Sequence, residues 1–434
     1  MKKIIVEYLV SSQKTAILED DKLIELLIED NKNSKKVSNI YRGVVKKVIL
    51  GIQACFVDIG FEKLAYLQLD KDSNIKAGQD ILVQVNKEEV GTKGAKLNTE
   101  ISLAGRYLVY IPTNDRITIS NKILDEKERF RLKKIANSVS KGAKGLIIRT
   151  EAVGCTKEEL EADINELKER YEEIIKEYKL GIGPKLLYKE LDFSSKYIKD
   201  NVNEDIEKIV TNDKCKYDEL KNILKSIKKE YVEKLELEEN KDIFDLYRVE
   251  NQIEKALSKK VWLKSGGYLI IDKTEALTVI DVNTGRFTGN LKLEETVYQT
   301  NIEAAIEVCR QLKLRDIGGI VIVDFIDMHK AKYKQEIINI LNEEFKKDKR
   351  KTEVLGMTRL GLVEITRRRE RDSIDKYYLE ECYTCEGKGS IKSINFILDD
   401  IEKQIIRIST HTSYKDITIE LNSRTLKIIK MNFM

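Results

Sequence analysis

The sequence contains few of the residues on which disulfide scaffolds and histidine-based enzymes depend. Only 6 of its 434 residues are cysteine, too few for a disulfide framework in a chain of this length. There are two histidines, His329 and His411, which argues against a histidine-rich metal site and against a Ser-His-Asp triad. Any catalysis would therefore depend on carboxylates, amides and cations.

Long apolar runs are missing as well. The N-terminal segment MKKIIVEYLV continues directly into SSQKTAILED and lacks the pattern of a signal peptide. No run reaches the roughly 20 apolar residues of a membrane-spanning helix. Lysine and arginine number 78 against 74 acidic residues, giving a net charge of +4, which excludes a uniformly basic protein but allows a locally basic groove. We expect a cytoplasmic protein without a membrane span.

The chain is long enough for several structural units. Residues 1–37 begin with alternating, hairpin-like segments. Residues 38–100 read as five short strands broken by glycines and ending in the basic loop GTKG, which predicts a small closed barrel of the oligonucleotide-binding type. Residues 101–190 mix strands with highly charged helices, and residues 191–256 are lysine-rich and weakly patterned.

The segment 257–370 has the most regular pattern and predicts an α/β layer. GGYLIIDKTEALTVIDVNT reads as two strands joined at Lys273 and Thr274, and LEETVYQTNIEAAIEVCRQLK as a helix. GIVIVDFIDM is almost wholly apolar, as expected of a central strand that is covered on both faces.

Two strands of this layer carry carboxylates. Alternation along LTVIDVN puts Asp281 and Asn283 on one face and turns Val282 into the layer. Asp324 follows five residues of apolar strand, and alternation would put Asp327 on the opposite face from it. Carboxylate and amide oxygens are ligands for Mg²⁺, which promotes phosphodiester cleavage. The alternative is that both acids only cap turns after strands.

At these residues the sequence resembles a known family. The block EALTVIDVNTGRF, LEETVYQTNIEAA and RQLKLRDIGGIVIVDFIDM is similar to the catalytic block of the ribonuclease E/G family, and the likeness extends from about residue 1 to 390. The chain is closer to the short ribonuclease G type. The resemblance implies an endoribonuclease that cuts single-stranded AU-rich RNA, prefers a 5′-monophosphate, leaves 5′-phosphate and 3′-hydroxyl ends, and acts in rRNA and mRNA processing and turnover.

The resemblance also implies an arrangement of domains and a catalytic site. Asp281 and Asp324 would hold the catalytic Mg²⁺, and Asn283 would orient Asp281 or the scissile phosphate. The domains would be a ribonuclease H-like scaffold (1–37 and 191–256), an S1-type RNA-binding barrel (38–100), a 5′-end sensor (101–190), a DNase I-like catalytic unit (257–380), a zinc-link (381–390) and a truncated small C-terminal domain (391–434).

Further site residues follow from the same resemblance. In the barrel, Phe56, Tyr66 and Lys93 match the family's RNA-binding positions, with a tyrosine where phenylalanine is common; a single barrel aromatic is otherwise more often a core residue. The residues that match the 5′-phosphate pocket are Gly105, Val109, Arg149 and Thr150. A second basic position of that pocket falls on Asn121 or Lys122.

Cys382 and Cys385 form a lone CxxC motif. A structural zinc site needs four ligands, so one chain supplies half of one. By the resemblance, two subunits would share one Zn²⁺ and form a homodimer, while the short C-terminus leaves tetramer formation open. A redox motif is the alternative, although no thioredoxin-like βαβ pattern surrounds the pair. For the whole chain, the alternatives are a non-catalytic RNA-binding protein and a nuclease that cuts DNA.

Overall fold

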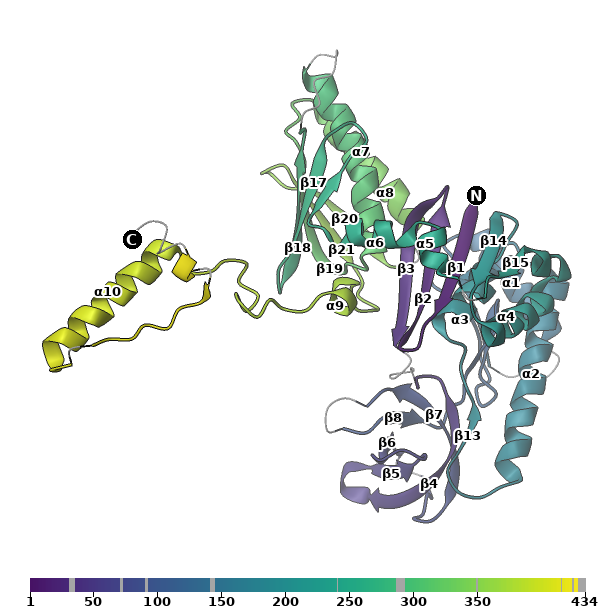
Figure 1. Cartoon of the computed structure of the whole chain (residues 1–434). Helices are drawn as coiled ribbons and strands as arrows, with labels where there is room; N and C mark the ends of the chain where they lie inside the picture. The colour runs from purple at the N-terminus through teal and green to yellow at the C-terminus, as the bar shows by residue number, and fades with distance from the viewer. Residues whose placement is uncertain are drawn as a thin grey trace. The chain divides into compact units, whose positions relative to one another are not determined.

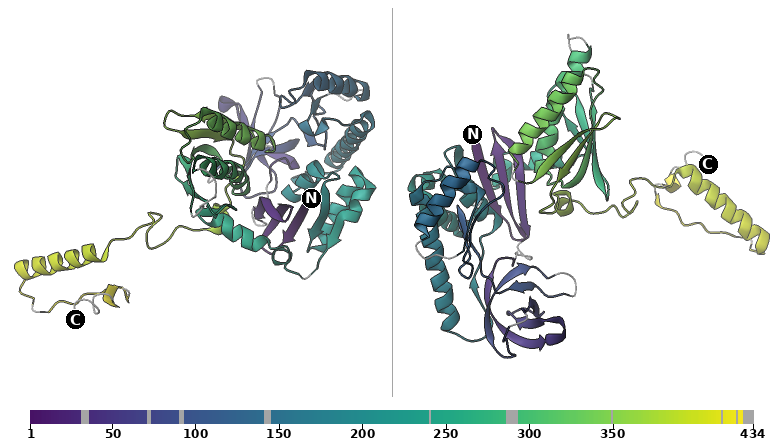
Figure 2. Two further views of the ribbon diagram at one scale, coloured as in Figure 1. Left: turned by 90° about the horizontal axis from the view of Figure 1, so that it is seen from above. Right: turned by 180° about the vertical axis from the view of Figure 1, so that it is seen from behind.

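A computed structural model describes residues 1–30, 36–70, 73–89, 93–140, 145–239, 241–285, 293–348, 350–414, 416–423 and 425–427. The chain divides into two compact units, Met1–Ile374 and Asp375–Met434. Within the described residues the first unit forms four sheets, whose strands and flanking helices can be followed in Figures 1 and 2. The result is a multidomain α/β protein, as the sequence predicts.

The first sheet joins the N-terminal strands to strands from the middle of the chain. Its strands, in spatial order, are β15 (Leu235–Leu237), β14 (Ile206–Thr211), β1 (Lys2–Tyr8), β2 (Ser12–Glu19) and β3 (Lys22–Asp30). β1 pairs in parallel with β14 and antiparallel with β2. Ile4 and Val6 of β1 share a core with Leu220 and Leu224 of α4 (Lys214–Ile227). The other helices of this part of the chain are α3 (Phe193–Asn201), η3 (Lys229–Lys234), α5 (Ile243–Leu246) and α6 (Val249–Leu257).

A closed barrel follows the first three strands. Its strands are β4 (Ile40–Ile49), β5 (Ala54–Asp58), β6 (Ala65–Gln68), β8 (Lys96–Asn98) and β7 (Asp80–Lys87), with η1 (Leu50–Ile52) between β4 and β5. β7 pairs back onto β4 and so closes the barrel around a core that includes Val57, Leu67 and Val83. β13 (Lys185–Tyr188) also pairs with β4. The small five-stranded barrel predicted from the glycine-broken strands is confirmed.

The third sheet is small and is packed against two helices. It contains β11 (Ile117–Ile119), β12 (Leu146–Ile148), β10 (Leu108–Tyr110) and β9 (Leu103–Ala104), with η2 (Thr150–Ala152) after β12. The helices are α1 (Glu126–Val139) and α2 (Lys157–Lys179). α2 begins with a capping box in which Thr156 and Glu159 each accept the other's backbone N–H.

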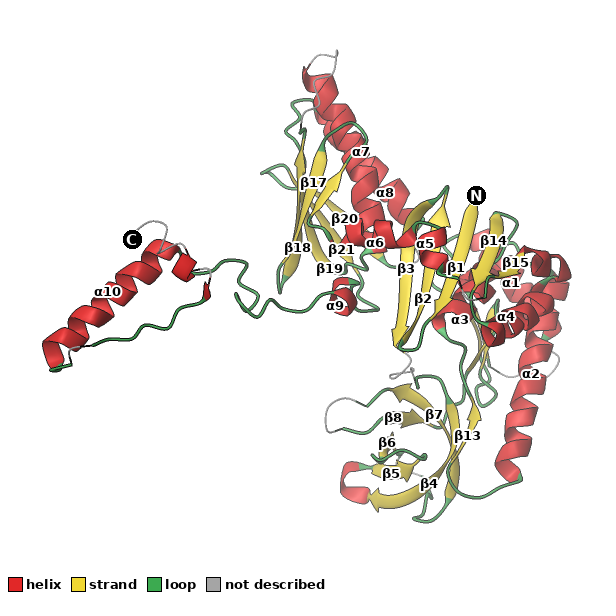
Figure 3. Ribbon diagram, in the orientation of Figure 1, coloured by secondary structure: helices red, strands yellow, loops and turns green. Residues whose placement is uncertain are grey.

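The fourth sheet carries the acids. Its spatial order is β16 (Lys260–Trp262), β17 (Tyr268–Lys273), β18 (Leu277–Asn283), β19 (Gly319–Asp324), β21 (Leu362–Arg367) and β20 (Thr352–Met357). The helices α7 (Leu293–Leu314) and α8 (Ala331–Lys346) lie along one face of the sheet, as Figure 3 shows. Their apolar side chains form one core with the inward residues of the strands.

The opposite face of this sheet is open, which corrects one prediction. β19 is not covered on both faces: Val321 and Val323 are fully buried, whereas Ile320 is 51% exposed and Asp324 is also exposed. The apolar run therefore reflects burial on one face and tolerance of apolar residues on the other. Because cross-strand partners point to the same side, a continuous outward row of side chains crosses the strands of the sheet.

The second unit contains α9 (Asp375–Tyr378), the CxxC segment and α10 (Ile394–His411). Ser393 caps α10 by accepting the backbone N–H of Phe396. Among the helices that the structure describes, none has both the length and the apolar character that crossing a membrane requires.

Candidate active site

Asp281 and Asp324 are direct neighbours across two parallel strands. β18 and β19 pair so that Asp281 lies opposite Asp324, and both residues are exposed on the open face. Adjacent strands are about 4.8 Å apart. Two carboxylates at this separation, on the same face, can share one hard cation.

Asn283 orients the first of these carboxylates. Its Nδ2 donates a hydrogen bond of 2.7 Å to Oδ2 of Asp281. The alternation of β18 places both side chains outward, while Val282 between them is buried in the core below. The expected side-chain directions at 281, 282 and 283 are therefore confirmed.

The electrostatics of the pair favour a bound cation. Partial burial, followed by the charges of Asp281 and Asp327, raises the pKa of the Asp324 carboxyl above its usual value. The strand β19 ends at Asp324, so strand alternation does not decide the direction of the Asp327 side chain, whose charge acts on Asp324. Carboxylates that repel one another are stabilised by a divalent ion between them.

The donor set fits Mg²⁺. This ion is held in proteins by one or two carboxylates, with water and substrate phosphate completing its octahedron. Asp281 and Asp324 could supply those carboxylates, and the open face leaves room for the remaining ligands. No group of three or more His, Cys, Asp and Glu side chains gathers within the described ranges, so a fully protein-enclosed metal site is not found there.

The barrel places Phe56 and Tyr66 side by side on its outer surface. The two residues are cross-strand partners on β5 and β6, and their ring centroids are 6.2 Å apart in an edge-to-face arrangement. Their chain neighbours Cys55, Val57 and Leu67 are buried, so the two rings lie outside the barrel core and are half-buried. A core role is therefore excluded for both rings.

The strand pairing places one lysine, Lys96, next to these rings. Lys93 is exposed, and the preceding part of its GTKG loop lies outside the described residues. Lys96 pairs with Tyr66 across β8 and β6 and is also exposed. Lys96 was not predicted as an RNA-binding residue from the sequence. Its place at the start of the barrel strand β8, just after the basic GTKG loop, could have indicated it.

The third sheet brings Gly105 and Arg149 together. Nη1 of Arg149 donates to the carbonyl oxygen of Gly105 at 2.6 Å. A side chain at Gly105 would collide with the Asp163 carboxylate, which accepts the backbone N–H groups of the next residues. Thr150 directly follows Arg149, and Val109 is half-buried on β10 beside the same strand pair.

The Arg149 guanidinium is already paired with carboxylates. Nη1 and Nη2 bind the two oxygens of Asp200 at 2.8 Å each, and Nε lies 3.4 Å from Glu151. Asp200 belongs to α3 of the first sheet's layer, so this contact joins two parts of the unit. Asp200 was not found from the sequence, because nothing in its local pattern distinguishes it from other helix-surface acids.

The CxxC segment forms a turn suited to thiolate ligands. Glu386 N–H donates to Cys382 O at 2.7 Å, and Gly389 N–H donates to Cys385 Sγ at 3.4 Å. Hydrogen bonds from Cys385 and Thr384 lower the pKa of the Cys382 thiol. The two thiols fit half of a tetrahedral zinc site.

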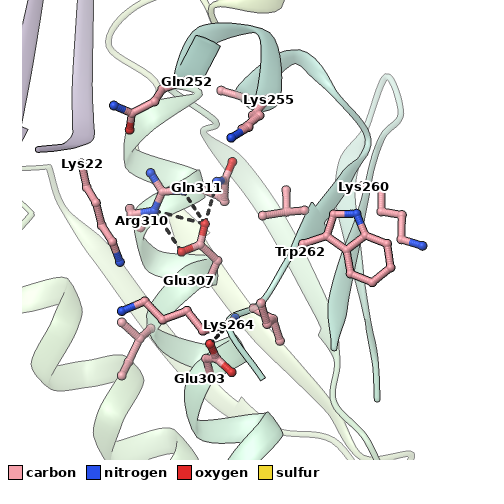
Figure 4. A pocket seen from close by; sticks show the side chains of 14 residues that line it. Lys22, Gln252, Lys255, Lys260, Trp262, Lys264, Glu303, Glu307, Arg310 and Gln311 are labelled. Atoms are coloured by element: carbon pink, nitrogen blue, oxygen red, sulfur yellow. Dashed lines mark hydrogen bonds and ion pairs between the residues drawn. The ribbon is translucent and has the colours of Figure 1, made fainter. Parts of the chain in front are cut away.

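A cavity of about 650 Å³ lies elsewhere in the first unit, at the edge strand β16 (Figure 4). Its lining includes Lys22, Lys264 and Arg310 together with Lys260 and Trp262 of β16, and Asp281 and Asp324 are not among its lining residues. Lys22 and Lys264 point toward one another in Figure 4, and burial followed by the charge of Lys264 lowers the pKa of Lys22. The acids instead occupy an open surface, which suits a long polymer better than a small molecule.

Comparison with known proteins identifies the class of enzyme. The model of the ribonuclease E/G family matches residues 102–370. The chain is 39% identical to ribonuclease G of Haemophilus influenzae over 91% of this chain and 85% of that protein. It is 38% identical to ribonuclease G of Escherichia coli K12 over 93% of this chain and 87% of that protein. It is 33% identical to ribonuclease E of Haemophilus influenzae over 95% of this chain but 47% of that protein.

These matches, together with the carboxylate pair and the barrel, define an endoribonuclease of RNA processing. The chain belongs to the ribonuclease E/G family.

Proposed function

We propose that this protein is a Mg²⁺-dependent endoribonuclease that cuts single-stranded, AU-rich RNA and favours substrates with a 5′-monophosphate. It would act in the cytoplasm in the processing and turnover of rRNA and mRNA. The observation that carries the catalytic part is the register that sets Asp281 opposite Asp324 on an open sheet face, with Asn283 bound to Asp281. The base preference and the 5′ preference rest on the family relationship.

The chemistry follows from the positions of these side chains. Asp281 and Asp324 would hold Mg²⁺, and Asn283 fixes the direction of the Asp281 carboxylate. In this position the ion would supply polarisation of the phosphoryl oxygen and a lowered pKa of water. In-line attack of water on phosphorus would form a new P–O bond as the bond to the 3′ oxygen breaks. The hydroxyl of the water stays on the 5′-phosphate and its proton goes to the leaving 3′ oxygen, which leaves 5′-phosphate and 3′-hydroxyl ends.

The same proposal assigns the domains. Residues 1–37 and 191–256 would form a ribonuclease H-like scaffold, residues 38–100 an S1-type barrel and residues 101–190 a 5′-end sensor. Residues 257–380 would form a DNase I-like catalytic unit, followed by the zinc-link and the short C-terminal domain. In the barrel, stacking of unpaired bases on Phe56 and Tyr66 would contribute about 1–3 kcal/mol per base, and Lys93 would attract phosphate.

Recognition of the 5′ end would use Arg149 and Thr150, with Gly105 and Val109 lining the pocket. A guanidinium fork and a hydroxyl suit a terminal phosphate. Because Asp200 occupies both Nη atoms of Arg149, the phosphate would have to exchange with this carboxylate. The preference for a 5′-monophosphate would therefore depend on the difference in free energy between two ion pairs of Arg149, one with the phosphate and one with Asp200.

Cys382 and Cys385 of two copies would bind one Zn²⁺ and form a homodimer. The lowered pKa of Cys382 and the N–H group aimed at Cys385 Sγ support thiolate ligation. Whether two such dimers associate further is left open.

One cleavage assay tests the central proposal. A short AU-rich oligoribonucleotide is offered with a 5′-phosphate or a 5′-hydroxyl, with Mg²⁺ or with chelator. We expect cleavage only with Mg²⁺, faster cleavage of the 5′-phosphate form, and no cleavage by Asp281→Asn or Asp324→Asn, both of which should still bind RNA.

The matched control is Asp272→Asn, which changes a carboxylate of β17 that pairs with Lys259 at 2.6 Å. This variant should cleave normally. Full activity in either Asp281→Asn or Asp324→Asn would contradict the assignment of the acid pair. Cleavage in the presence of chelator would contradict the proposed dependence on Mg²⁺.

A further inference from the structure

The open face of the fourth sheet carries two aromatic residues in the row of Asn283, next to the row that contains the proposed catalytic acids. Across β16, β17 and β18, Trp262 lies opposite Tyr268, and Tyr268 lies opposite Asn283. In the adjacent row, Lys260 of β16 lies opposite Ile270 of β17, and Ile270 lies opposite Asp281 of β18. Since cross-strand partners share a face, the side chains of Lys260, Trp262 and Tyr268 lie on the face of the acids.

Trp262 is not a core residue. Its side chain is 63% exposed, whereas the residues on either side of it, Val261 and Leu263, are buried in the core of the sheet. Figure 4 shows the indole of Trp262 and the side chain of Lys260 next to each other, directed away from the cluster of Lys22 and Lys264. An exposed indole on the functional face of a sheet is a candidate contact for a ligand.

Lys260 joins the two rings into one cationic and aromatic surface. Its Nζ lies 4.0 Å from the Trp262 ring centroid and 3.7 Å from that of Tyr268, and the two rings are 5.3 Å apart at an angle of 64°. In the described part of the chain no carboxylate forms an ion pair with Lys260, so its charge is available to an anion.

We propose that Lys260, Trp262 and Tyr268 form a nucleotide-binding subsite beside the catalytic acids, in which an unpaired base of the RNA stacks on the indole and the adjoining phosphate lies by Lys260. This inference rests on the proposed function, because it places one part of the substrate of that same site. The row geometry sets Lys260 two strand spacings, about 10 Å, from Asp281. That distance suits a nucleotide close to, but not at, the scissile linkage.

The chemistry favours RNA over other occupants of this surface. A nucleotide offers the flat π-face of its base to the indole and a negatively charged phosphate to the ammonium group, whereas an apolar protein surface would leave Lys260 without an anion. The subsite is also continuous with the acid pair, so one extended strand can reach both. Stacking requires no particular base, which suits an enzyme that reads unpaired RNA.

The single tryptophan of the sequence makes this subsite directly observable. Trp262 is the only tryptophan among the 434 residues, so intrinsic fluorescence excited at the indole reports on this position alone. The full-length Asp281→Asn variant is titrated with a 5′-phosphorylated AU-rich oligoribonucleotide in Mg²⁺, while fluorescence anisotropy of a label on the RNA measures total binding. We expect the tryptophan emission to be quenched with the same midpoint as the anisotropy change.

Oligonucleotides with abasic positions separate stacking from other causes of quenching. Replacing single bases along the oligonucleotide should abolish the quenching at one or two positions next to the linkage that the wild-type enzyme cuts. If the RNA saturates the protein by anisotropy and the emission is unchanged, or if no abasic position affects the quenching, the subsite does not exist.

Substitution gives a second, independent readout. Trp262→Ala should raise KM for the oligonucleotide by about 5- to 150-fold, the equivalent of about 1–3 kcal/mol for one stacked base, whereas Trp262→Phe should recover most of the loss. Lys260→Gln should weaken binding and flatten its dependence on salt. Unchanged KM in Trp262→Ala would overturn the subsite, while retained cleavage by Asp281→Asn would instead overturn the proposed catalytic site, so the two failures are distinguishable.

Discussion

At the scale of single residues, the Asp281 carboxylate is oriented by one neighbour. Its Oδ2 accepts a hydrogen bond from the side-chain amide of Asn283. This leaves Oδ1 as the oxygen that could bind a cation shared with Asp324. Groups that orient a metal-binding carboxylate affect catalysis without touching the substrate, and their loss typically costs about 10- to 100-fold in activity or metal affinity. In the proposed mechanism Asn283 would therefore act as a positioning residue.

Replacing Asn283 tests this role. Asn283→Ala should lower the single-turnover cleavage rate by about 10- to 100-fold and shift the Mg²⁺ dependence to higher concentration, because the carboxylate is no longer held in place. RNA binding should change little. The measurement is a set of cleavage rates over a Mg²⁺ titration, with Asp272→Asn as the control; a variant curve that coincides with the wild-type curve would show that Asn283 has no part in positioning.

The residues of this site differ in how far the sequence alone could find them. Alternation gave the common face of Asp281 and Asn283, because a spacing of two is read directly in a strand. The pairing of Asp281 with Asp324 depends on which strands are neighbours, and local pattern does not encode that; the resemblance supplied it. The side-chain direction of Asp327 could not be predicted from alternation, because β19 ends three residues before it.

At the scale of elements, Arg149 links the third sheet to α3 of the first layer. It forms a bidentate pair with Asp200 and binds two backbone carbonyls, of Gly105 and Arg106. Side-chain contacts from the surrounding carboxylates raise the pKa of the Arg149 guanidinium against the effect of its burial, which lowers it. The guanidinium therefore stays charged and links the two elements, and under the proposed function the same group would also bind the 5′-phosphate.

Removing the competing charge should shift that balance. Asp200→Asn should increase the ratio of cleavage rates for 5′-phosphate and 5′-hydroxyl substrates by several-fold, because the phosphate no longer displaces a carboxylate. Arg149→Gln should bring the ratio close to one. Rates are measured on paired oligonucleotides that differ only at the 5′ end, and Asp218→Asn, an exposed acid of α4, is the control. A ratio that falls in Asp200→Asn would mean that Asp200 supports phosphate binding.

Strands and helices were predicted correctly where a single hydrophobic periodicity runs through the segment. The barrel strands and the β17–β18 turn follow directly from alternation and glycine placement. The covering of β19 was misjudged, because an apolar run does not reveal whether one face or both are buried. The outward apolar residues, such as Ile320, carry no polar signal that would have marked the open face.

At the scale of the whole molecule, segments that are far apart in the sequence pair to form one sheet. β1 pairs with β14 although about 200 residues separate them in the sequence, because the barrel and the third sheet lie between the two strands in the chain. Local periodicity does not encode such pairings, since it only specifies which residues face a core. Local periodicity likewise does not encode how two chains assemble. The CxxC motif is the sequence feature from which a dimer was predicted.

The zinc proposal predicts a dimer that depends on metal. The two thiols of one chain fill half of a tetrahedral site, so one Zn²⁺ per two chains is expected, and Cys382→Ser or a strong chelator should convert the dimer to a monomer. Sedimentation analysis gives the mass, and metal analysis of the same sample gives the stoichiometry. Cys215→Ser, which changes an exposed thiol of α4, should leave both unchanged. A dimer that survives loss of zinc would place the interface elsewhere, and one Zn²⁺ per monomer would mean that the chain completes the site with its own residues.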